Sequence, residues 1–215
     1  MGDPIALLEG LGWVVAAPVF VLGVTLCLGV ETMLSRRFKT QIRGFDFALS
    51  GGTGLLVAVA IIALNSAPLT AVCTAIAATS LLSAARTDWR FGHIADVHSA
   101  LIAMTALLAA PSLMNQNDYV STLLGGLLAL IILGGASLIS LLRGRTVGLG
   151  MGDVLLAAAA ALWCGVNFVG PALFIAAITT ITMALVFKRD LRKPLAFAPG
   201  LSFGFALATL IGLSF

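Results

Sequence analysis

Long apolar segments dominate this sequence, and every second connection between them is basic. Of the 215 residues, 60% are hydrophobic and only 10% are charged, with a mean hydropathy of +1.11. A soluble domain of this length needs more polar surface, so the composition predicts an integral membrane protein. Because about 20 apolar residues span a bilayer, we interpret eight segments as transmembrane helices. They cover residues 11–30, 46–64, 69–85, 94–111, 119–142, 153–169, 171–187 and 196–215.

The basic residues predict how these segments are oriented. All twelve lie in four groups, one at every second connection: Arg36, Arg37, Lys39 and Arg43; Arg86 and Arg90; Arg143 and Arg145; Lys188, Arg189, Arg192 and Lys193. Positively charged connections stay in the cytoplasm, so both termini are expected outside. The net charge of +3 then reflects topology, and we expect lipid headgroups, not nucleic acid, as partners of most of these side chains.

The expected fold is therefore all-α, a polytopic membrane bundle of about eight helices that forms one domain over residues 1–215. The start of the chain lacks a basic n-region, so the first span is expected to remain uncleaved. Cys27, Cys73 and Cys164 each lie inside an apolar segment without a C-x-x-C motif, which indicates small buried side chains. His93 and His98 do not share one level of a helical face, so no metal or other cofactor is expected.

A carboxylate follows a glycine-rich turn at the start of the sixth segment. Gly150-Met151-Gly152-Asp153 leads directly into an apolar run. Alternate glycines allow a tight turn and the close approach of another chain. The positive end of the helix dipole stabilises an ionised Asp153 there. A simple helix cap is the plain alternative; a phosphate-binding loop is disfavoured because the Gly-Lys-Ser/Thr ending is absent. A charge at the edge of an apolar segment indicates a functional site.

Asp88 is the possible partner of Asp153 and is expected on the same side of the membrane. It ends the third apolar segment, in the hairpin from Arg86 to Asp96. It could be a solvated charge, an ion-pair partner of Arg86 or Arg90, or a catalytic acid. Two carboxylates at one membrane face are the minimum equipment of an aspartyl protease, because such a pair shares a proton and activates water.

The last basic connection runs into a helix-breaking stretch that contains Pro194, Pro199 and Gly200. Irregular backbone at this depth is tolerated only in protein or next to water. Its free N–H and C=O groups could pair with an extended peptide. An ordinary helix start with prolines is the alternative.

Together these segments resemble the type IV prepilin peptidases, membrane aspartyl peptidases with a G-x-G-D motif. That family pairs a D-x-R-x-x-x-I-P-N-like segment with a later G-x-G-D-V-K-L and an I-P-F-G-P-F-L-like segment before its last span. The matching residues here are Asp88, Arg90 and Ile94; Gly150, Gly152, Asp153 and Val154; and Phe197, Pro199 and Leu201. The resemblance implies Asp88 and Asp153 as the catalytic pair, with Gly150, Gly152, Arg90, Asp96 and Pro199 binding substrate or shaping the site.

The resemblance also implies the substrate and the place of action. The substrate would be a prepilin or pseudopilin, whose short basic leader is cut at the cytoplasmic face of the inner membrane. Ala95, Asp96 and Leu155 depart from the family's usual Pro, Asn and Lys. The loop 31–45 lacks the four-cysteine domain of bifunctional members, so a short peptidase-only form without methylation is expected.

Three other functions remain open on the sequence. A protease like presenilin or signal peptide peptidase shares the G-x-G-D aspartate but would cut within a membrane helix. An ion-coupled transporter would use the two aspartates as coupling sites, although such sites usually lie near the midplane. The substitutions at Ala95, Asp96 and Leu155 also fit an inactive homologue.

Overall fold

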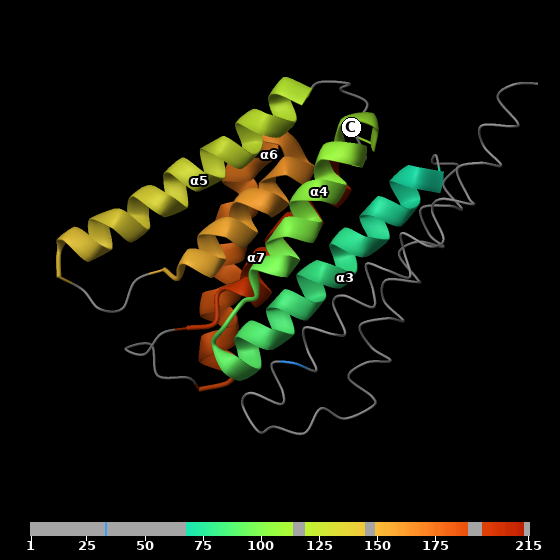
Figure 1. Cartoon of the computed structure of the whole chain (residues 1–215). Helices are drawn as coiled ribbons and strands as arrows, with labels where there is room; N and C mark the ends of the chain where they lie inside the picture. The colour runs from blue at the N-terminus through green and yellow to red at the C-terminus, as the bar shows by residue number, and fades with distance from the viewer. Residues whose placement is uncertain (1–32, 34–67, 114–118, 145–148, 189–194, 213–215) are drawn as a thin grey trace, which may run out of the picture.

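The computed structural model describes residue 33 and residues 68–113, 119–144, 149–188 and 195–212 (Figure 1). Every regular element among these residues is a helix, which confirms the all-α prediction for this part of the chain. The helices are α3 (Pro68–Phe91), α4 (Asp96–Leu113), α5 (Tyr119–Leu142), α6 (Met151–Val186) and α7 (Ala198–Gly212). The first two predicted spans and Cys27 lie outside the described residues. The total of eight spans and the orientation of the termini stay predictions.

Helix α3 continues past the expected end of its apolar segment at residue 85 and includes Asp88 and Arg90. It ends at Gly92, whose N–H donates to the carbonyl oxygen of Asp88 at 2.8 Å and whose φ is +61°. A left-handed residue after the last helical turn is a common helix ending, and glycine adopts it without a Cβ penalty. Asp88 therefore lies on a rigid helix, in its last turn, and not in a loop.

Helix α6 combines the sixth and seventh predicted spans. Its backbone leaves the helical region at Gly165, where φ is +66° and ψ is 173°. The two legs run in opposite directions, because both ends of α6 lie near the end of α3. At the start of α6, Gly152 packs closely against Ile94, just after α3. At its end, the rings of Phe187 and Trp89 meet edge to face with centroids 5.2 Å apart.

Among the residues that the structure describes, two helices, α5 and α6, are long and apolar enough to cross a membrane, and shorter apolar stretches cover Asp96–Ala109 and Ala198–Thr209. At 1.5 Å per residue, the second leg of α6 over 166–186 is about 30 Å long, the thickness of a hydrocarbon core. The lengths and composition of these helices, and the many exposed large apolar side chains on α5, suggest a membrane protein.

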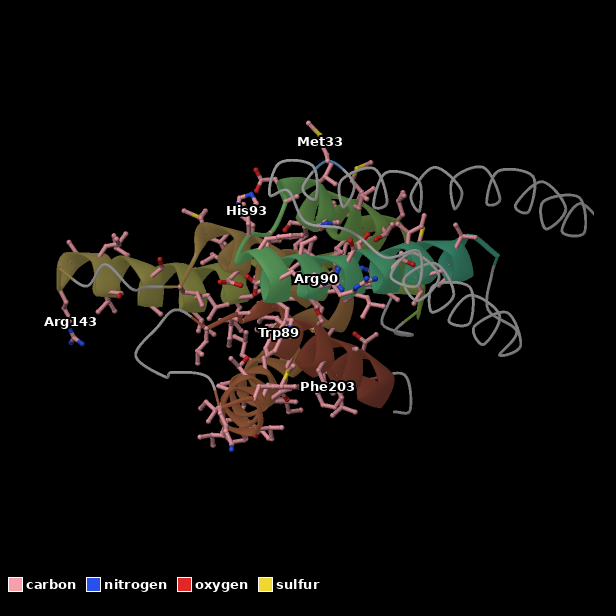
Figure 2. The ribbon with its side chains drawn as sticks, turned by 90° about the horizontal axis from the view of Figure 1, so that it is seen from below. Met33, Trp89, Arg90, His93, Arg143 and Phe203 are labelled. Carbon is pink, nitrogen blue, oxygen red and sulfur yellow. The ribbon has the colours of Figure 1, made fainter. Side chains whose placement is uncertain are left out.

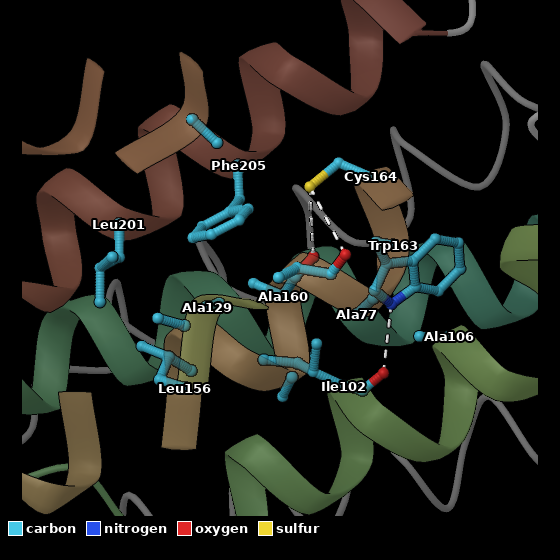
Figure 3. Packing of buried hydrophobic residues seen from close by; sticks show 14 of the residues in the cluster. Ala77, Ile102, Ala106, Ala129, Leu156, Ala160, Trp163, Cys164, Leu201 and Phe205 are labelled. Atoms are coloured by element: carbon cyan, nitrogen blue, oxygen red, sulfur yellow. Dashed lines mark hydrogen bonds between the residues drawn. The ribbon is translucent and has the colours of Figure 1, made fainter. Parts of the chain in front are cut away.

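Small side chains fill the core, so the helices approach one another closely (Figure 3). The largest fully buried apolar side chains are Phe205, Ile102, Leu156 and Leu201. Trp163 is also buried and donates its indole N–H to the carbonyl oxygen of Ile102 at 3.2 Å, which ties α6 to α4. Cys73 and Cys164 are buried free thiols, as expected.

Glycines on α5 allow close packing against α6 at some positions only. On α5, Gly125 and Gly126 face the backbone of Ala161 and the side chain of Leu162 on α6. A Cβ at either position would come within 3 Å of these atoms. Gly135, further along the same helix, has no described atom within 4 Å of the place of a Cβ. The tightest α5–α6 contact is thus at the beginning of α5. Further along, the hydroxyl of Ser137 still donates to the carbonyl oxygen of Leu149 at 3.1 Å, and the end of α5 diverges in Figure 1.

Candidate active site

Asp88 is buried at the end of α3, with 7% of its surface exposed. Its Oδ2 accepts a hydrogen bond from the backbone N–H of Ala198, the first residue of α7, at 3.0 Å. The first N–H groups of a helix have no partner inside the helix, so an acceptor supplied by another element satisfies one of them. The positive end of the α7 dipole also stabilises a negative charge on Asp88.

The start of α7 is shaped by the proline-containing segment that the sequence singles out. Residues 195–197 form no regular element, and the N–H of Leu201 donates to the carbonyl oxygen of Phe197 at 3.0 Å, which closes the first turn. Pro199 lies within this turn, where the missing N–H costs no intrahelical bond. One turn further, the hydroxyl of Ser202 donates to the carbonyl oxygen of Leu81 at 3.0 Å. Two contacts therefore fix α7 against α3 beside Asp88.

Asp153 lies in the first turn of α6, at the same end of the bundle. Its own N–H and that of Val154 donate to the carbonyl oxygen of Gly150, at 3.1 and 3.2 Å. Gly150 is the extended residue that precedes the helix, with φ −65° and ψ 148°. A Cβ on Gly150 would lie 3.3 Å from Oδ2 of Asp153, closer than nearly all such contacts. The glycine thus leaves room for the aspartate carboxylate to fold back over the turn.

Gly152 connects the two aspartate segments directly. A Cβ at this position would meet the Cβ of Ile94 at 3.2 Å. Ile94 is buried in the short connection between α3 and α4. Two residues that the sequence puts into separate motifs are thus packed against each other, and a side chain larger than glycine would push Asp153 away from α3.

The two carboxyl groups are close enough for their charges to repel each other. Oδ1 of Asp153 is buried and has no hydrogen-bond partner among the described residues. A buried, unpartnered carboxylate oxygen is unfavourable, and a proton on one of two adjacent carboxyl groups relieves both problems. The geometry therefore suits a pair of aspartates that holds one proton.

The remaining candidates lie toward the surface. Arg90 is exposed at the end of α3, near Trp89 in Figure 2. Asp96 is exposed at the first position of α4, where the helix dipole favours an acid. Arg143, at the end of α5, lies far from Arg90 in the same view.

Two features of the site escape the sequence. The amide of Ala198 is a backbone group, and its only signal is the neighbouring Pro199, which marks a helix start. The second feature is the fully buried His98, whose Nε2 lies 3.5 Å from the hydroxyl of Ser83 across α3 and α4. His93, by contrast, is exposed, so the two histidines do not converge. No cluster of three or more His, Cys, Asp or Glu in the described part of the chain could hold a metal ion.

The comparisons with known proteins agree with this arrangement at the level of the family. Searches of curated proteins and of solved structures found no match. The profile of the type IV leader peptidase family matches residues 75–185, just over half of the chain. This range contains Asp88, Gly150, Gly152 and Asp153, and it extends from α3 to the end of α6. The chain therefore belongs to the type IV leader peptidase family.

Proposed function

We propose that this protein is a membrane aspartic endopeptidase that removes the basic leader of a prepilin or pseudopilin. The observation that carries the proposal is the meeting of Asp88 and Asp153 at one end of the bundle, in a chain of the type IV leader peptidase family. The proposed location is the inner membrane, which the chain crosses several times. The site would face the cytoplasm, since basic residues flank Asp88 and follow α6.

The proposed chemistry needs only the two carboxyl groups and a water molecule. Two nearby carboxylates cannot both ionise easily, so the pair shares one proton. The ionised member takes a proton from water, and the protonated member polarises the scissile carbonyl. No covalent intermediate forms. Because Asp88 and Asp153 lie at helix ends, cleavage is expected at the edge of the substrate's apolar helix, which stays in the bilayer.

Site-shaping roles follow for the neighbouring residues. Gly150 and Gly152 give Asp153 its room and its approach to α3, and Pro199 sets the start of α7 beside Asp88. Arg90 and Asp96, both exposed, are proposed to contact the leader where it leaves the site. Lipid headgroups are the proposed partners of most other basic side chains.

Leader cleavage in cells tests the proposal. Wild type, Asp88→Asn and Asp153→Asn are co-expressed with candidate prepilins from the same genome, and leader removal is read from a mobility shift and N-terminal sequencing. Each substitution is expected to lower cleavage roughly 1,000-fold, because it removes a proton-transfer group without changing the volume.

Asp96→Asn makes the same chemical change at an exposed residue that is proposed to contact the leader but not to transfer protons, so it is expected to lower cleavage far less than either of the other substitutions. Cleavage that persists in this variant and disappears in the other two identifies the pair. Undiminished cleavage in Asp88→Asn or Asp153→Asn would overturn the two-aspartate mechanism. No cleavage of several leaders by well-folded wild type would instead favour an ion-coupled transporter or an inactive homologue.

A further inference from the structure

Asp88 and Asp153 have different surroundings, although they lie at the same end of the bundle. Asp88 is almost fully buried and accepts a backbone N–H from another helix at 3.0 Å. Asp153 is half-buried, and its Oδ1 has no partner among the described residues. A carboxylate is stabilised by every N–H that it accepts, whereas a buried oxygen without a partner favours the protonated form.

The contact between Ala198 and Asp88 is held by the packing of α7 against the second leg of α6. A Cβ on Gly200 would collide with Thr180 and with the carbonyl oxygen of Ala176. A Cβ on Gly204, one turn later, would collide with the carbonyl oxygen of Ala172. The two helix backbones therefore approach as closely as glycine allows. This close packing places the start of α7, and with it the N–H of Ala198, beside Asp88.

The basic residues on α3 and α6 also differ, and this difference again favours a negative charge on Asp88 over one on Asp153. Arg86 and Arg90 lie two positions before and after Asp88 on α3, so they add positive charge to this end of the helix although they project from its other side. By contrast, α6 contains no Lys or Arg from Met151 to Val186, and Leu155 follows Asp153 two positions later. Positive charge near a carboxyl group favours its ionised form. No basic residue on α6 stabilises an ionised Asp153 in this way.

Two influences act in the opposite direction. Asp153 lies in the first turn of α6, where the helix dipole favours negative charge, and it accepts a backbone hydrogen bond from Gly150. Asp88 lies in the last turn of α3, whose dipole disfavours negative charge. The N-terminus of α7, however, also points at Asp88, so each aspartate has one helix N-terminus beside it. The unpartnered Oδ1 and the absence of basic residues on α6 then decide in favour of a protonated Asp153.

We propose that Asp88 is the ionised general base of the pair, that Asp153 is the protonated acid, and that the Ala198 amide is the positioning group that fixes this division. The assignment rests on the proposed peptidase function. Water gives one proton to Asp88 while its oxygen bonds to the carbonyl carbon, and Asp153 gives its proton to the carbonyl oxygen. The resulting diol collapses when Asp88 protonates the amide nitrogen, the C–N bond breaks, and a diol proton returns to Asp153.

Two small reagents with opposite requirements test the assignment on the purified full-length protein. An epoxide is opened by an ionised carboxylate, which attacks its carbon and forms an ester. A diazoacetamide needs a carboxylic acid, whose proton moves to the diazo carbon before the carboxylate displaces N₂. Esters are located by peptide mass spectrometry, and the exposed Asp96 serves as the reference for a solvated carboxyl group.

In wild type, the epoxide is expected to label Asp88 severalfold more than Asp153, and the diazoacetamide to label Asp153 severalfold more than Asp88. The reverse pattern would overturn the assignment. Equal labelling of the two residues by each reagent would also overturn the assignment, and so would failure of both reagents to label either residue in a preparation that cleaves a leader.

Ala198→Pro tests the positioning role. Proline fits the first position of a helix but lacks the N–H that Asp88 accepts. The preference of the epoxide for Asp88 is expected to fall severalfold, whereas Ala196→Pro, two residues earlier, keeps the amide and the preference. An unchanged preference in folded Ala198→Pro would overturn the role of the amide. If this variant does not fold, Gly200→Ala, which displaces the start of α7, is expected to give the same fall, and an unchanged ratio there is equally decisive.

Leader cleavage measured on the same preparations separates the two proposals. If the leader is cleaved but the labelling pattern is reversed, the assignment of base and acid is wrong and the peptidase proposal stands. If the labelling is as expected but no leader is cleaved, the peptidase proposal is wrong and the assignment of the ionised and protonated aspartates stands.

Discussion

Helices α5 and α7 both pack on α6 through glycines, but buried residues run along the described length of α7 and only along the first half of α5. On α7, Gly200, Leu201, Gly204 and Phe205 are buried. On α5, the buried residues all lie between Ser121 and Ala129, and large apolar side chains beyond this range are exposed. The candidate site is built where the packing is tight, on α3, α6 and α7. The second half of α5 presents an apolar surface suited to lipid.

Gly200→Leu against Gly135→Leu is the strongest test of this difference. A Cβ on Gly200 collides with Thr180 and Ala176, whereas the same addition on Gly135 meets no described atom within 4 Å. Overpacking of a close helix contact is expected to lower the free energy of unfolding by about 3 kcal/mol or more and to abolish leader cleavage. Gly135→Leu should leave both unchanged. Denaturation in mixed micelles and the cleavage assay measure the two effects, and equal losses would show that α5 is packed as tightly as α7.

The second test compares two leucines. Leu201 on α7 has no exposed surface, and Leu138 on α5 is 57% exposed. Truncation of a buried leucine leaves a cavity, so Leu201→Ala is expected to cost about 3 kcal/mol of unfolding free energy. Leu138→Ala should change it by less than about 0.5 kcal/mol. A cost at Leu138 similar to that at Leu201 would mean that another part of the protein covers α5.

The sequence predicted the meeting of Asp88 and Asp153 at one end of the bundle better than it predicted the path of the chain. The alternating basic groups predicted that Asp88 and Asp153 lie on the same side of the membrane, because positively charged connections stay in the cytoplasm. The bounds 119–142 also agree with α5, whose apolar run is uninterrupted. Hydropathy does not report backbone dihedrals, however, so the break between the sixth and seventh spans was predicted after residue 169, whereas the chain turns at Gly165. The amide of Ala198 could not be predicted, since every residue except proline has one.

The third test addresses the turn that brings both ends of α6 to the site. Gly165 has a φ of +66°, and a Cβ there would lie 3.0 Å from the hydroxyl of Ser121. Gly165→Ala is therefore expected to cost about 1–3 kcal/mol of unfolding free energy, because this backbone conformation is essentially restricted to glycine. Gly170→Ala, on the same helix with open space around it, should be neutral or slightly stabilising, because alanine favours helix. Thermal unfolding of both variants measures this difference. Equal unfolding midpoints for the two variants would contradict the idea that the turn requires glycine.

The smallest expected effect concerns the bond that ties α6 to α4 behind the site. Trp163→Phe keeps an aromatic ring in a buried position but removes the N–H that the Ile102 carbonyl oxygen accepts at 3.2 Å. Loss of one such hydrogen bond is expected to cost about 1 kcal/mol. Because this contact lies near the end of the first leg of α6, far along the helix from Asp153, cleavage by the folded variant should stay near the wild-type rate. A large loss of activity at nearly unchanged stability would show that α4 and the first leg of α6 position Asp153 together. The closely packed helices that form the site would then include α4 as well as α3, α6 and α7.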